Sequence, residues 1–136
     1  MNGGNMNRAR LNTLANALDV HPAPAQFDLN DWFADQTDGE WLPPITPDND
    51  PIYCGYAACA VGYACTLPEL RAEGLTFTTA GGEPNEPVYK DATGWQAVRD
   101  FFDLDAIPAD RLFDVNSYSY GATPQDVAKR IRAYIA

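Results

Sequence analysis

The amino-acid sequence predicts a single α+β domain of 136 residues that is mainly helical. We expect it to pack around a central uncharged helix at residues 53–66 and to carry a small antiparallel β-hairpin. Three observations lead to this class. Residues 53–66 contain no charged side chain, and a helix without a polar face belongs inside a core. Helical periodicity recurs on both sides of this segment, and one stretch alternates as a strand does. Hydrophobic residues make up 46% of the chain, which is typical of a globular domain.

Helices are predicted at both ends of the chain, because apolar residues recur there with helical spacing. The first covers residues 7–19. The second begins at Thr123, where Pro124 suits the first helical position. The residues expected to face inward are Leu11, Leu14, Ala15, Leu18, Val127, Ile131, Tyr134 and Ile135.

Shorter elements are predicted between these helices. Residues 75–79 alternate like a strand, and residues 87–89 can return beside them as a hairpin. Thr93 and Gln96 form a capping-box pattern that opens a further helix, and residues 108–113 add a short one. Thr66 is expected to cap another short helix that ends at Gly74.

The segment before the central helix is expected to hold a short helix and a long loop. Asp28 suits the N-cap of a helix at residues 28–33, with Phe27 packing on Trp32. Residues 34–51 contain four prolines and five acids with little periodicity, which indicates a long acidic, proline-rich surface loop.

Charge excludes some classes of function. The net charge is −10, from 19 acidic against 9 basic residues, and no Lys or Arg lies between Leu11 and Leu70. Direct binding to nucleic-acid phosphates is therefore disfavoured, because it needs basic side chains. A basic protein surface is the favoured partner. No segment is long and apolar enough for a membrane span, and the N-terminus lacks the apolar core of a signal peptide, so we expect a cytoplasmic protein.

The three cysteines, Cys54, Cys59 and Cys65, are expected to be free thiols in a reducing compartment. Cys54 lies near the start of the predicted central helix, where a thiolate would be stabilised, and His21 is the one histidine that could assist it. The simpler interpretation is that all three are small buried hydrophobic residues. Their spacing does not suit zinc, and the EF-hand pattern fails in the acidic segment, so no metal or cofactor is predicted.

The acidic segment also carries large aromatic side chains, a combination by which interfaces anchor and steer a basic partner. The alternative is that the aromatic residues belong to the core and the acids to a solvated rim. The residues predicted to bind a partner are Asp28, Asp31, Trp32, Asp35, Asp38, Glu40 and Trp41.

Three segments, Phe27–Phe33, Cys54–Ala64 and Ala122–Ile131, resemble a group of small phage and prophage proteins. The shared motifs are Phe-x-x-x-x-Trp-Phe, Cys-Gly-x-x-Ala-Cys-x-x-Gly and a terminal Ala-Thr-Pro helix. This chain departs from the group in its insertion at 34–51 and in Tyr63, where relatives often carry His or Trp. The resemblance implies a phage-encoded accessory protein that acts inside a bacterial host.

The sequence therefore predicts an acidic accessory protein that binds and inhibits a basic host protein, such as one that binds nucleic acid. Two alternatives stay open: a cysteine-dependent enzyme using Cys54 and His21, and a structural virion or assembly component.

Overall fold

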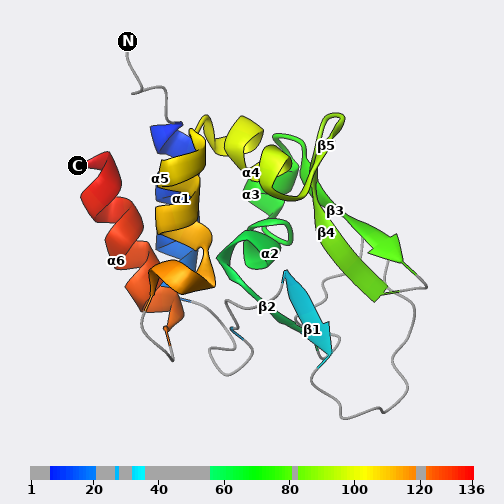
Figure 1. The fold of residues 1–136 in the computed structure, drawn as a ribbon, viewed down its shortest axis with the longest axis horizontal. Coiled ribbons are helices and arrows are strands. Elements are labelled where there is room, and N and C mark those ends of the chain that lie inside the picture. The colour runs from blue at the N-terminus through cyan, green and yellow to red at the C-terminus, as the bar shows by residue number, and fades with distance from the viewer. Residues whose placement is uncertain (1–6, 21–26, 28–31, 36–55, 81–82, 119–121) are drawn as a thin grey trace.

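A computed structural model describes residues 7–20, 27, 32–35, 56–80, 83–118 and 122–136. The fold is α+β and mainly helical, as predicted, with its helices on one side and a small antiparallel sheet on the other (Figure 1). The helices are α1 (Arg8–Asp19), α2 (Ala60–Ala64), α3 (Pro68–Arg71), α4 (Gly94–Phe102), α5 (Ala106–Phe113), the 3-10 helix η2 (Val115–Ser117) and α6 (Pro124–Ile135). The strands are β1 (Phe33–Asp35), β2 (Tyr56–Ala58), β3 (Leu75–Ala80), β4 (Glu83–Tyr89) and β5 (Ala92–Thr93).

The two terminal helices, α1 and α6, lie side by side (Figure 1). Each begins with a capping side chain: the Asn7 side chain accepts from the Arg10 N–H, and Thr123 forms a capping box with Asp126. The predicted apolar faces are confirmed. Tyr134 and Ile135 are partly buried against the core, and the other predicted residues are fully buried: Leu11, Leu14, Ala15, Leu18, Val127 and Ile131. Local sequence signals therefore set both ends of the fold.

The predicted hairpin is also confirmed. Strands β3 and β4 pair antiparallel, with Leu75 opposite Tyr89 and Phe77 opposite Pro87, and β5 adds a short third strand beside β4. Leu75 and Phe77 are buried. Helix α4 packs on β4, so the sheet and the helices share one core.

Residues 59–65 of the central segment are buried as expected, but the segment is not one helix over residues 53–66. Residues 53–55 lie outside the described residues, and Tyr56–Ala58 form β2, which pairs antiparallel with β1. Cys59 is extended, with φ −74° and ψ −179°, and its thiol accepts the Gly62 N–H at 3.4 Å, so helix α2 begins only at Ala60. An uncharged run fits a buried strand as well as a buried helix, and the pairing with β1 decides between them.

Two other local predictions are corrected. Phe33 belongs to strand β1 and not to a helix at 28–33, so the predicted 34–51 loop begins with strand residues; the remainder of the loop lies outside the described residues. Thr66 does not cap α3, because its hydroxyl donates to the Tyr63 carbonyl at 2.7 Å, and the helix begins at Pro68 with Leu67 as N-cap. The first difference arises from a distant partner, strand β2, whereas the second arises from a local hydrogen bond to a residue three positions earlier.

Candidate functional site

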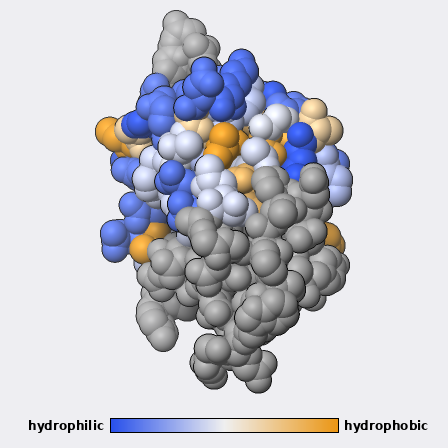
Figure 2. Space-filling view, turned by 90° about the vertical axis from the view of Figure 1, so that its right-hand side faces the viewer, coloured by the Kyte–Doolittle hydropathy of each residue, from blue (hydrophilic) through white to orange (hydrophobic). Residues whose placement is uncertain are grey.

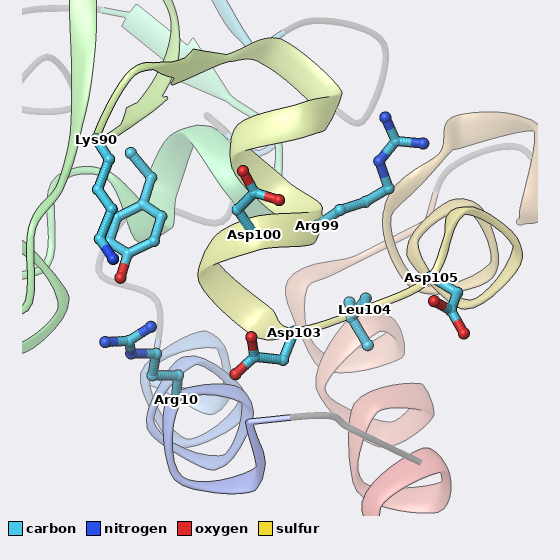
Figure 3. A pocket seen from close by; sticks show the side chains of 8 residues that line it. Arg10, Lys90, Arg99, Asp100, Asp103, Leu104 and Asp105 are labelled. Carbon is cyan, nitrogen blue, oxygen red and sulfur yellow. The ribbon is translucent and has the colours of Figure 1, made fainter. Parts of the chain in front are cut away.

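An open depression of about 480 Å³ lies where α1, the end of β4 and the α4–α5 connection meet (Figure 3). Arg10 and Lys90 are on one side, Arg99 and Asp105 on the other, and Asp100 and Asp103 between them. The lining consists of three basic, three acidic, one aromatic and one aliphatic residue: Arg10, Lys90, Arg99, Asp100, Asp103, Asp105, Tyr89 and Leu104.

Arg10 is held firmly by its surroundings. Its Nε lies 2.8 Å from Glu73 Oε1, and its Nη1 donates to the Phe101 carbonyl at 2.8 Å. The guanidinium carbon lies 4.2 Å from the Phe101 ring centroid and 5.5 Å from that of Tyr89. Burial opposes the charge, but hydrogen bonds to Glu73 and Tyr89 outweigh it and raise the pKa of Arg10. Arg10 is therefore a fixed cation at physiological pH.

Two lining residues have an uncommon backbone conformation. Lys90, in the turn between β4 and β5, has φ 55°, and Asp103, the C-cap of α4, has φ 53°. They are the two non-glycine residues with positive φ in the part of the chain that the structure describes. This region is unfavourable for residues with a Cβ, and such residues concentrate at functional sites. The two positive-φ residues therefore favour this depression as the candidate functional site.

The charged groups of the lining differ in how they are partnered. Arg99 Nη2 donates to Gln96 Oε1 at 2.7 Å, whereas its buried Nε has no hydrogen-bond partner among the described residues. Asp100 accepts from Gln96 Nε2 at 2.7 Å. Asp105 is the N-cap of α5, yet its carboxylate makes no capping hydrogen bond. Some charges thus stabilise α4, and others are left for solvent or a ligand.

No Ser, Thr, Cys or His lines the depression, which is formed by six charged side chains together with Tyr89 and Leu104. Within the described ranges, no group of three or more His, Cys, Asp or Glu residues could hold a metal ion.

The structure places only part of the predicted partner-binding segment. Trp32 is partly buried and meets Trp95 edge-on, with ring centroids 5.1 Å apart and planes at 60°. The backbone of Asp35 belongs to β1. Trp32 therefore contributes to packing near the core. The other predicted partner-binding residues lie outside the described residues: Asp28, Asp31, Asp38, Glu40 and Trp41. The alternative catalytic pair, Cys54 and His21, also lies outside them.

The two described cysteines are buried. The thiol of Cys59 caps α2, and burial raises the pKa of Cys65 well above its usual value. Both features disfavour a reactive thiolate. Cys59 and Cys65 are therefore structural residues, in agreement with the simpler interpretation of their sequence.

A second acidic region was missed in the sequence. Asp100, Asp103, Asp105 and Asp110 are all exposed at the α4–α5 corner, and Ile107 among them is 65% exposed. The signal was present, since residues 100–110 contain four acids and no base. The side of the molecule seen in Figure 2 likewise gathers hydrophilic residues over its upper half, with a few hydrophobic ones between them.

Comparison of the chain with known proteins gives no match among family models, curated proteins or solved structures. Among the described residues, no helix has the length and apolar character needed to cross a membrane. The function must therefore be argued from the chemistry of the chain itself.

Proposed function

We propose that this protein is an acidic binding protein that engages a basic protein partner and inhibits it by covering its basic surface. Support comes first from the net charge of −10. A charge of this size attracts a basic surface over distances longer than a direct contact and increases the rate of encounter.

The observation that carries the proposal is how the basic residues are used. Arg8, Arg10, Arg71 and Arg130 each donate to a main-chain carbonyl oxygen. Ion pairs between described residues join only Arg10 with Glu73 and Arg132 with Asp19. These arginines thus stabilise helix ends and connections. Among the described residues, most carboxylates form no ion pair with another described residue.

Acidic residues are concentrated in two parts of the chain. At the α4–α5 corner, Asp103, Asp105 and Asp110 are exposed and take part in no ion pair with a described residue. The segment from Asp28 to Asp50 adds seven acids without a base. A basic partner could meet either region, and the acidic–aromatic segment remains the predicted interface because it also supplies Trp32 and Trp41.

The resemblance of the sequence to phage proteins suggests that the partner is a protein of a bacterial host. A small acidic protein inside a bacterial cell meets basic proteins that bind nucleic acid, and carboxylates spaced over its surface can take the place of phosphates. In this proposal the host protein is held by its nucleic-acid-binding surface, and inhibition follows from competition.

A pull-down from bacterial lysate tests the proposal, with the immobilised protein washed at low and at moderate salt. We expect a basic protein to be retained at low salt and released as the Debye length falls from ~10 Å at 0.1 M toward ~3 Å at 1 M salt. The captured partner should lose its own nucleic-acid binding in competition. Retention of only neutral or acidic proteins, unaffected by salt, would contradict the proposal.

Charge variants then locate the interface. Neutralising Asp35, Asp38 and Glu40 together should slow association with the captured partner, because rim charges act on encounter. Trp41→Ala should accelerate dissociation if Trp41 anchors the partner. Asp103→Asn/Asp105→Asn/Asp110→Asn removes the same amount of charge at the α4–α5 corner and serves as the matched control. A larger effect of this control would move the interface to that corner.

A further inference from the structure

The geometry points to a second binding site: we propose that the depression between Lys90 and Asp105 binds a small zwitterion, with its anionic group at Arg10 and Lys90 and its cationic group at Asp103 and Asp105. This inference goes beyond the proposed protein partner, since it concerns a small molecule and a different part of the surface.

The charge of the depression differs from that of the whole molecule. Three basic and three acidic residues line it, so its formal charges cancel, whereas the chain carries −10. Arg10 and Lys90 lie together on one side, Asp103 lies in the middle and Asp105 on the far side (Figure 3). Arg99 also lies on the far side, where its Nη2 donates to Gln96 Oε1. A site with two poles favours a ligand that carries both charges over one that carries either alone.

The cationic pole has a fixed part and an available part. Arg10 is oriented by Glu73 and the Phe101 carbonyl. The ammonium of Lys90 lies 5.2 Å from the Tyr89 ring centroid and makes no hydrogen bond or ion pair with a described residue. Its donors can therefore turn to a carboxylate or phosphate without breaking a hydrogen bond or ion pair to a described residue.

The anionic pole is formed by exposed carboxylates without protein donors. Asp105 makes no capping hydrogen bond, and Asp103 takes part in no hydrogen bond or ion pair with the rest of the described chain. The Leu104 side chain lies between these two carboxylates in Figure 3 and is 6% exposed.

The backbone holds the poles apart. Lys90 and Asp103 both have left-handed φ values, one in a tight turn and the other at a helix end. Because these conformations are fixed by the β4–β5 pairing and by the end of α4, the two side chains project from rigid positions. Binding then requires little ordering of the protein, which lowers its cost.

The experiment titrates the full-length protein with ε-aminocaproate and follows backbone amide resonances by NMR. Caproate, which lacks the ammonium, and hexylamine, which lacks the carboxylate, are the matched probes. We expect ε-aminocaproate to shift the resonances of residues around Lys90 and Asp103–Asp105 in a saturable way, with at least tenfold weaker binding of either single-charge probe.

Substitutions test the two poles separately. Lys90→Met and Asp105→Asn should each weaken binding of ε-aminocaproate about tenfold, as expected for loss of one charge-assisted contact. Lys129→Met and Asp110→Asn, which change the same residue types outside the depression, should leave it unchanged. Unchanged amide spectra away from each substituted position verify that the variants fold.

Three results would overturn the inference: no saturable shift with ε-aminocaproate, equal affinity for a single-charge probe, or equal weakening by the control variants. None of them affects the proposed protein partner, whose test is retention of a basic protein from lysate. Conversely, a failed pull-down leaves the zwitterion titration fully informative.

Discussion

The paired helices α1 and α6 and the corner between α4 and α5 use charged side chains in opposite ways. Between α1 and α6, Arg132 forms an ion pair with Asp19 and donates to Asn16, and Arg8 donates to the Ile135 carbonyl. These charged side chains therefore link α1 to α6. At the corner, Asp103, Asp105 and Asp110 are exposed and have no basic partner among the described residues.

This difference separates charges that hold the fold from charges that are available for recognition. A partnered charge contributes to stability through its hydrogen bonds, and an unpartnered exposed carboxylate contributes little. We therefore expect large effects on stability in α6 and the elements that pack on it, and small effects at the corner.

The largest effect is expected for a matched pair of isoleucines. Ile131 in α6 is fully buried, and Ile107 at the corner is 65% exposed. Ile131→Ala should lower the free energy of unfolding by about 2–5 kcal/mol, because it removes buried methyl groups and leaves a cavity. Ile107→Ala should change it by less than about 0.5 kcal/mol. Urea unfolding of both variants gives the comparison, and equal losses would contradict it.

Arg130 provides the next largest effect. It donates to the Arg111 carbonyl at 3.0 Å and to the Ser117 carbonyl, and its guanidinium carbon lies 3.9 Å from the Tyr118 ring centroid. Arg130→Ala should cost about 2 kcal/mol, since charged hydrogen bonds and a cation–π contact are lost together. The neighbouring Lys129 is exposed, and Lys129→Ala should leave the stability nearly unchanged. Thermal melts of the two variants measure both effects. Similar losses for the two would show that the junction does not depend on Arg130.

Tyr118 should make the stability of the protein sensitive to alkaline pH. Burial raises the pKa of Tyr118 to about 12, although the nearby Arg130 cation opposes the shift. The unfolded chain loses this proton near pH 10, before the folded protein does, so stability should fall as pH rises from about 10 to 12. Absorbance titration should show a tyrosine that ionises late, and Tyr118→Phe should remove this step. A late titration that persists in Tyr118→Phe would assign the shift to another tyrosine.

Tyr118→Phe also removes the hydrogen bond from its hydroxyl to the Leu112 carbonyl, at 2.6 Å. At neutral pH this should cost about 1 kcal/mol in urea unfolding.

The smallest effect is expected from the corner acids. Asp103→Asn/Asp105→Asn/Asp110→Asn should change stability by less than about 0.5 kcal/mol, since no partner is lost. Asp126→Asn is the contrast, because its carboxylate accepts from the Thr123 N–H at 2.9 Å in the capping box of α6; it should cost about 1 kcal/mol. Thermal melts of both variants show whether the contribution of a carboxylate to stability depends on its hydrogen-bond partner and not on its charge alone.

The candidate site was less predictable than the fold. The sequence pointed to acids and aromatics at 28–41, and of these the structure describes Trp32, packed on Trp95, and the backbone of Asp35 in β1. The depression joins Arg10 from α1 with Lys90 and Asp103, which are about eighty and ninety residues further along the chain, and no local pattern links them.

The sequence by itself determined α1, α6 and the β3–β4 hairpin, because capping residues, apolar periodicity and strand alternation act within a few neighbouring residues. Only the tertiary structure decided that Tyr56–Ala58 form a strand, since its partner, Phe33–Asp35, lies more than twenty residues earlier. Tertiary structure also decided the use of the arginines, whose acceptors are carbonyls at the ends of other elements. Local signals fix conformation, whereas the partners of a strand edge or a long charged side chain depend on what folding brings beside them.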